Sequence, residues 1–171
     1  MSEEIEIGPV RWEELDALVQ LERHVFGEGL AITRRQMRYL LRTPRALAAA
    51  ARTGGGSVVG WAIALARRRK EGRSARLCSL AVDPRFRGRG VGRRLVCSVL
   101  AAAAERGMKR VFLEVAAENE AALRLYGRLG FVAVVALPDY YGRGRHGLRM
   151  LKACVPPGAP AAKRPGARGP A

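Results

Sequence analysis

The chain has 171 residues, of which 49% are hydrophobic and 27% charged, so it is predicted to be one globular domain rather than a disordered chain. Its formal net charge of +16 points to an acidic ligand, a polyanionic partner or an arginine-rich background, and composition does not choose among them. The opening MSEEIEIGPV lacks a basic segment before an apolar one, and no apolar run reaches 18 residues. We therefore expect a cytoplasmic protein without a signal peptide or membrane helix.

The cysteines and histidines do not suggest a metal site. The three cysteines are odd in number and lack redox or metal-ligand spacing, and only two histidines accompany them. We expect no metal and predict that the cysteines are buried, reduced side chains. They are Cys78, Cys97 and Cys154.

The first half of the chain predicts strands and amphipathic helices. Apolar residues recur at helical spacing over 13–26, and a second helix follows Thr33, which is a suitable N-cap. Residues 46–52 are ambiguous because alanine favours a helix, whereas the short length and the following TGGGS favour a strand. We assign strands to 5–10, 46–52 and 58–65, helices to 13–26 and 33–41, and a basic turn to RRRKEGR at 67–73.

The second half continues the alternation. Residues 77–82 are apolar on both faces except at Ser79, which is typical of a central strand. Val91, Leu95 and Val99 form one stripe of a helix. The order predicts a mixed α/β domain with helices on both sheet faces. The assigned elements are strands at 77–82, 111–115, 131–137 and 147–151 and helices at 91–106 and 119–129.

The composition changes near the end of the chain. Residues 153–171 contain five prolines and three basic residues without an acid, so we expect a disordered basic tail after a domain spanning 1–152. Most of the positive charge therefore belongs to the domain.

The stretch DPRFRGRGVGRRL at 83–95 places glycines and arginines at the start of a predicted helix. A strand, a glycine-rich turn and a helix N-terminus present unpaired N–H groups and a positive dipole end to an anion. The spacing fits neither a Walker A loop nor the dinucleotide fingerprint. We predict a pyrophosphate cradle, with a basic solvated turn as the alternative. Its residues are Arg87, Gly88, Arg89, Gly90, Val91, Gly92 and Arg93.

Three motifs carry a family resemblance. Arg87-x-x-Gly90-x-Gly92 after SLAVDP resembles the acetyl-CoA signature of the GCN5-related N-acetyltransferases (GNAT). LEVAAENEAALRLYGRLGFV (113–132) is similar to the second half of that family's core, and PDYYGRGRHGLRMLK (138–152) to its closing hairpin. Within the family, the chain most resembles enzymes that acetylate protein N-terminal amines, such as ribosomal-protein alanine acetyltransferases. The resemblance implies a mostly antiparallel sheet with a splayed strand pair at the acetyl-CoA site.

Glu114 is the candidate general base. It is the one ionisable residue in the strand VFLEV, and a carboxylate among apolar neighbours is desolvated and becomes a better proton acceptor. An exposed position on the wet face of the strand is the alternative. The resemblance assigns Glu114 the removal of a proton from the substrate ammonium, through water.

Tyr126 is the candidate general acid. It lies two helical turns after Asn119, so both residues share one helix face. The resemblance implies that Tyr126 contacts the cofactor and protonates the departing thiolate of coenzyme A. It places Asn119 at the cofactor as well, although Asn119 also suits an N-cap. The backbone groups that it places along the pantetheine arm, with an N–H for the thioester oxygen, belong to Leu80, Ala81 and Val82.

The sequence says less about the identity of the substrate than about the cofactor. Tyr140 and Tyr141 match a family position that walls the peptide channel, although hairpin packing also explains them. Arg145 and His146 stand where members specific for peptide N-termini often carry acids. We expect acetylation of a primary amine, foremost a protein N-terminal α-amine, while a small amine or a lysine side chain remains open. A nucleic-acid- or ribosome-associated protein and a catalytically silent acyl-CoA-binding module are the rival classes.

Overall fold

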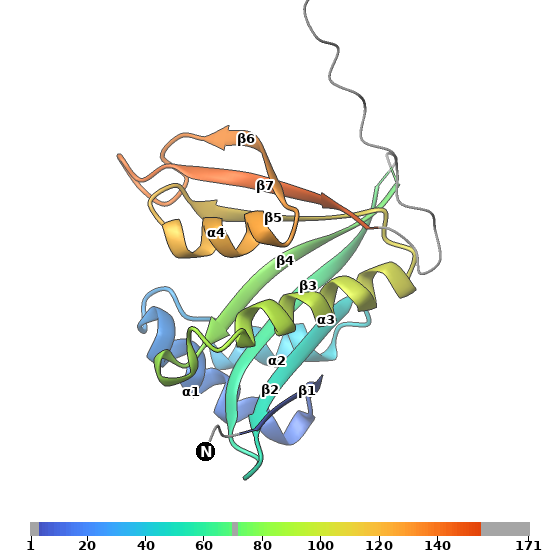
Figure 1. Cartoon of the computed structure of the whole chain (residues 1–171), viewed down its shortest axis with the longest axis vertical. Helices are drawn as coiled ribbons and strands as arrows, with labels where there is room; N and C mark the ends of the chain where they lie inside the picture. The colour runs from blue at the N-terminus through green and yellow to red at the C-terminus, as the bar shows by residue number, and fades with distance from the viewer. Residues whose placement is uncertain (1–3, 70–71, 155–171) are drawn as a thin grey trace, which may run out of the picture.

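A single seven-stranded sheet organises the chain. The computed structural model describes residues 4–69 and 72–154, and its strands follow the order β1-β2-β3-β4-β5-β7-β6 (Figure 1). Among the described residues only the β4–β5 pair is parallel, which confirms the mixed, mostly antiparallel α/β class. The strands are β1 (Ile5–Pro9), β2 (Ala46–Thr53), β3 (Val58–Arg69), β4 (Gly72–Val82), β5 (Arg110–Ala116), β6 (Val132–Leu137) and β7 (Gly147–Ala153).

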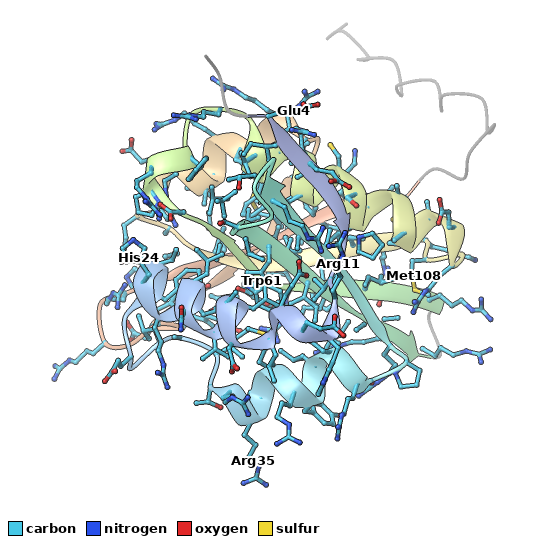
Figure 2. The ribbon with its side chains drawn as sticks, turned by 90° about the horizontal axis from the view of Figure 1, so that it is seen from below. Glu4, Arg11, His24, Arg35, Trp61 and Met108 are labelled. Carbon is cyan, nitrogen blue, oxygen red and sulfur yellow. The ribbon has the colours of Figure 1, made fainter. Side chains whose placement is uncertain are left out.

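Helices cover both faces of the sheet, as predicted (Figure 1). One face carries α3 and α4, whose apolar stripes join the larger core cluster. The other carries α1 and α2, and Figure 2 shows Trp61 of β3 next to α1, in the smaller cluster. Thr33 caps α2 by accepting the N–H of Gln36, as its side chain suggested. The helices are α1 (Leu15–Phe26), α2 (Arg34–Arg42), α3 (Val91–Glu105) and α4 (Glu120–Arg128).

The hairpin between β3 and β4 is longer than predicted. The expectation of a basic turn throughout 67–73 is wrong, because Arg67 pairs with Ser74 and Arg68 with Arg73 in an antiparallel ladder. Pairing with a neighbouring strand outweighs the low strand propensity of a charged run. The hairpin therefore carries arginine side chains on both faces of the sheet.

The last strand passes the predicted end of the domain. β7 ends at Ala153, and the Cys154 N–H donates to the Lys109 carbonyl oxygen at 2.8 Å. The rest of the predicted tail, 155–171, lies outside the described residues. Within the described ranges, none of the helices is long and apolar enough to cross a membrane.

The expectation that all three cysteines are buried is wrong for Cys97, which is exposed. It lies on α3 two residues after Leu95, so helical geometry turns it away from the buried stripe. Cys78 and Cys154 are partly buried free thiols.

Candidate active site

The candidate site is the gap where β4 and β5 part. Their ladder comprises only Ser74–Arg76 against Arg110–Phe112 in the described residues. Beyond it, β4 continues beside β3 and β5 beside β7. A register shift leaves Cys78 without a β3 partner, and such a bulge bends the strand that carries it. The predicted splayed pair is therefore present, with residues 80–82 along its β4 edge.

The N-terminus of α3 fits the predicted pyrophosphate cradle. Gly90, the N-cap, has φ +74° and provides no side-chain cap, so the first N–H groups of the helix remain for a ligand. A Cβ at Gly88 or Gly90 would meet no heavy atom within 4 Å, so the space in front of the loop is open. Arg87 Nε donates to the Val82 carbonyl oxygen at 3.1 Å, and this bond ties the cradle to the end of β4.

Two other residues of the predicted cradle contact protein groups. The Arg89 guanidinium lies 5.2 Å from the Phe86 ring centroid. A Cβ on Gly92 would lie 3.5 Å from Leu125 of α4. Gly92 therefore faces α4, whereas Gly88 and Gly90 face the open space.

Glu114 is buried, but its neighbours differ from the prediction. Its side chain is 4% exposed, and its two oxygens accept from Arg76 Nε at 2.7 Å and Arg149 Nη2 at 3.0 Å. The predicted apolar surroundings are therefore wrong, because two guanidinium groups offset the cost of burying the carboxylate. Sequence reasoning missed both arginines. The cross-strand register that pairs Glu114 with Arg149 could have indicated one of them.

The two tyrosines of the β6–β7 loop lie beside this ion-pair cluster. The Tyr140 hydroxyl accepts from Arg76 Nη2 at 3.4 Å, and the Tyr140 and Tyr141 rings meet edge to face at 5.0 Å. Burial, followed by Tyr140 and Glu114, raises the pKa of Tyr141. A Cβ on Gly147 would lie 3.1 Å from the Tyr141 ring, so glycine at this position lets both rings pack against β7.

Arg145 and His146, which depart from the family pattern, are engaged within the same loop region. Arg145 forms an ion pair with Glu118 at 3.1 Å. His146 Nδ1 accepts the N–H of Asp139 at 3.0 Å. Both side chains therefore stabilise the loop conformation.

Tyr126 lies on the opposite face of the sheet from Glu114. It belongs to the core cluster under α3 and α4, together with Leu113 and Val115, and strand alternation turns Glu114 to the other face. Burial, and then Tyr141, raises the pKa of Tyr126 to about 12, so its phenol stays protonated at neutral pH. Asn119 caps α4 by accepting the N–H of Ala122 at 3.1 Å. The structure therefore shows the N-cap role that the sequence suggested beside a contact with the cofactor.

A buried acid on α1 also reaches β4, and sequence reasoning missed it. Glu22 is 1% exposed. It accepts from Trp61 Nε1 at 2.8 Å, from the Ser79 hydroxyl and from the Ile32 N–H. In the sequence it is an ordinary polar position of an amphipathic helix, so no local signal marks it. It fixes α1 to the part of β4 that borders the gap.

This arrangement agrees with comparisons to known proteins. Residues 12–131 match the model of the Acetyltransferase (GNAT) family. The chain belongs to this family. At the family level this confirms the predicted acetyltransferase class and its acetyl-CoA cosubstrate. Within the described residues, no group of three His, Cys, Asp or Glu side chains gathers to hold a metal ion.

Among curated GNAT relatives, N-alpha-acetyltransferase MAK3 of Arabidopsis thaliana is 39% identical over 74 residues, covering 43% of this chain and 39% of the relative. The [Ribosomal protein bS18]-alanine N-acetyltransferase of Salmonella typhimurium is 42% identical over 67 residues, covering 39% and 45%. These matches span less than half of the relatives' length.

Solved GNAT structures match over most of the chain. Ard1 from Thermoplasma volcanium is 26% identical with a TM-score of 0.75, covering 88% of this chain and 98% of that one. The ribosomal-protein-S18-alanine N-acetyltransferase from Escherichia coli is 24% identical with a TM-score of 0.73, covering 88% and 94%. The second likeness confirms the fold.

Proposed function

We propose that this chain is an acetyl-CoA-dependent N-acetyltransferase whose acceptor is a primary amine, foremost a protein N-terminal α-amine. The observation that carries the proposal is the gap between β4 and β5, whose β4 edge lies next to the uncapped N-terminus of α3, with Glu114 and Tyr126 on opposite faces of the sheet. The N-terminal substrate is supported by relatives named N-alpha-acetyltransferase and bS18-alanine N-acetyltransferase.

In this proposal each part of the gap has one task. Acetyl-CoA supplies an acetyl group as a thioester. The cradle, Arg87–Arg93, holds the pyrophosphate with backbone N–H groups and cationic side chains, and Asn119, the N-cap of α4, contacts the cofactor. Backbone groups of Leu80, Ala81 and Val82 line the pantetheine arm, and an N–H there stabilises the charge that develops on the carbonyl oxygen.

Proton transfer is divided between two side chains. Glu114 accepts a proton from the substrate ammonium, directly or through one water, and so frees the nitrogen lone pair. The nitrogen then bonds to the acetyl carbon as the carbon–sulfur bond breaks, and the Tyr126 hydroxyl supplies a proton to sulfur. The ammonium loses two protons overall, of which one ends on the thiol and one reaches solvent. Tyr140 and Tyr141 wall the path by which the amine enters.

Turnover of acetyl-CoA with a panel of amines tests the proposal. The panel contains a peptide with a free alanine N-terminus, the same peptide with a blocked N-terminus and one lysine, and a small diamine. Thiol release and product mass identify the acceptor. We expect the free N-terminus to be acetylated fastest. Binding of acetyl-CoA without turnover of any amine would instead indicate a silent acyl-CoA-binding module.

Replacement of Tyr126 tests the general acid. Tyr126→Phe removes only the hydroxyl, so kcat should fall about 10²-fold, the scale of one acid–base group, while acetyl-CoA affinity stays within about twofold. Because burial raises the pKa of Tyr126 to about 12, the unmodified chain should show no alkaline loss of kcat below about pH 10 from this group. Tyr39→Phe, at an exposed position of α2, is the control. Equal kcat in both variants would contradict the role.

A second candidate function is binding of a polyanion such as RNA. Three adjoining hollows have arginines and no Asp or Glu among their lining residues. The first and second share Pro44 and Arg106, and the second and third share Arg42. Figure 2 shows Arg35, at one end, extending from α2 away from the molecule. We call this the basic surface. Its arginines are Arg11, Arg34, Arg35, Arg38, Arg42, Arg45, Arg67, Arg68, Arg73 and Arg106.

Salt dependence tests this second function. The logarithm of the affinity for a labelled single-stranded RNA should fall linearly with the logarithm of the salt concentration. Each neutralised phosphate adds about 0.7 to the magnitude of this slope. A triple variant of the basic surface should lower the slope by about 2. A triple variant of exposed arginines elsewhere should leave it unchanged, and equal slopes would contradict the assignment. The two variants replace Arg45, Arg68 and Arg73, or Arg23, Arg128 and Arg143, with Ser.

A further inference from the structure

A further hollow opens beside Glu114. Its volume is about 400 Å³, and it lies on the sheet face opposite α3 and α4, because residues 112 and 114 alternate with buried Val111 and Leu113. We call it the arginine pocket. Its lining side chains come from β3, β4, β5, β7 and the β6–β7 loop: Arg67, Ser74, Arg76, Arg110, Phe112, Glu114, Tyr140, Arg149 and Leu151.

The charges in this pocket do not balance. It has four arginines and one carboxylate, and that carboxylate pairs with Arg76 and Arg149. Among the described residues, neither Arg67 nor Arg110 has an acidic group within 4.0 Å. Both are partly buried. Partial burial weakens solvation of a cation, so a bound anion would gain two guanidinium partners with little competition from water.

The coenzyme is not the anion that this pocket suits. The cradle at residues 87–93 lies at the N-terminus of α3, which packs on the other face of the sheet. The arginine pocket lies on the face from which Glu114 is reached, and so on the side of the amine. Arg67 also lies over the Phe112 ring, with its guanidinium carbon 5.5 Å from the ring centroid, so its charge is held against another side chain that lines the pocket.

We propose that the amine substrate carries a carboxylate that binds Arg67 and Arg110 while its amine lies at Glu114. This inference rests on the proposed function. Along β5, Phe112 and Arg110 lie two and four residues before Glu114, which is about 7 and 13 Å of strand. An extended peptide advances by a similar distance per residue. An aspartate or glutamate within the second to fifth residue of a peptide therefore reaches the pocket, as does the carboxylate of an aminoalkyl acid of matching length.

Binding and turnover are measured separately to test the inference. C-terminally labelled peptides begin with Ala and carry one Glu, Gln or Lys at each of positions 2–5. Their affinity for the CoA-bound chain is read by fluorescence anisotropy, and kcat/KM by thiol release. We expect the best Glu peptide to bind about 10-fold more tightly than its Gln counterpart, the scale of one charge-assisted hydrogen bond, and the Lys peptide to bind most weakly. Aminoalkyl acids of increasing length compete in the same assay and identify a small-molecule source.

Charge variants assign the effect to this pocket. Arg110→Gln should lower the Glu-over-Gln preference about 10-fold, and Arg110→Glu should reverse it in favour of Lys. Arg128→Gln makes the same change in net charge at an exposed position of α4 and should keep the preference, which controls for attraction to a chain of charge +16.

The outcomes separate the two proposals. Equal binding of Glu and Gln peptides at every position, with no competition by any aminoalkyl acid, would overturn the arginine pocket even if neutral peptides are acetylated. A preference for carboxylates without turnover of any amine would support the pocket and overturn the proposed reaction. Loss of the preference in Arg128→Gln as well as in Arg110→Gln would also overturn the pocket.

Discussion

Glu114→Gln is expected to lower kcat at pH 7 by about 10² or more, the scale of a general base. The amide keeps the size of the side chain but cannot accept the substrate proton. Because Glu114 lies on the face opposite the cradle, acetyl-CoA affinity should remain within about twofold. Glu105→Gln, the same change at the exposed end of α3, serves as the control and should leave kcat unchanged.

The pH profile separates a base from a structural carboxylate. A protein N-terminal amine has a pKa of about 7.7–8.0, so much of it arrives protonated at pH 7 and needs a base. Above pH 8.5 or so the amine arrives neutral, and the loss caused by Glu114→Gln should shrink. A constant ratio of the two kcat values from pH 6 to 9.5, or a difference below threefold, would remove Glu114 from the mechanism.

The replacement also leaves Arg76 and Arg149 without their carboxylate. Removal of one partner from a buried ion pair is costly, about 3–5 kcal/mol where burial is complete. The two arginines are 32% and 40% exposed, so water should reduce this cost. Thermal unfolding of the variant, with and without CoA, shows whether a lower kcat comes from the missing base or from a smaller folded fraction.

The elements that the sequence predicted well are those with a local cause. The helix at 91–106 follows from the spacing of Val91, Leu95 and Val99, and all three are buried in α3. The glycine turn before that helix was also predictable, because glycines and arginines coincide with the start of the helix, and Gly88 and Gly90 do adopt positive φ. Its use as a pyrophosphate cradle remains a proposal. The ambiguous segment 46–52 is the exception, because local propensity did not decide it. It forms the strand β2, which pairs with β1 on one side and β3 on the other.

The parts that could not be predicted depend on contacts across the sheet. Glu114 is 35 residues from Arg149 and 38 from Arg76, so no local pattern reveals the ion pairs that replace the expected apolar surroundings. Arg67 and Arg110 meet in one pocket only because β3, β4 and β5 are neighbours. The charge of +16 is visible in the composition, but its distribution over the cradle, the basic surface and the arginine pocket, of which the last two share Arg67, required the fold.

Gly90→Val is expected to weaken acetyl-CoA binding by about 10²-fold, as measured by calorimetric titration. Valine at this position places a branched side chain in the open space before the first N–H groups of α3, where the pyrophosphate is proposed to bind. Charge-assisted hydrogen bonds contribute about 1.5–3 kcal/mol each, so one or two lost contacts suffice for this effect.

Backbone strain must be separated from this steric effect. Gly90 has φ +74°, a conformation that costs a branched residue about 1–3 kcal/mol, so some loss of thermal stability is expected as well. Gly107→Val is the matched control, because Gly107 has φ +71° and lies at the other end of α3, about 22 Å away along a helix of 15 residues. Both variants should lose similar stability, but only Gly90→Val should lose acetyl-CoA affinity. Equal affinities in the two variants would show that strain alone accounts for the change, and the pyrophosphate would then have to bind away from the N-terminus of α3.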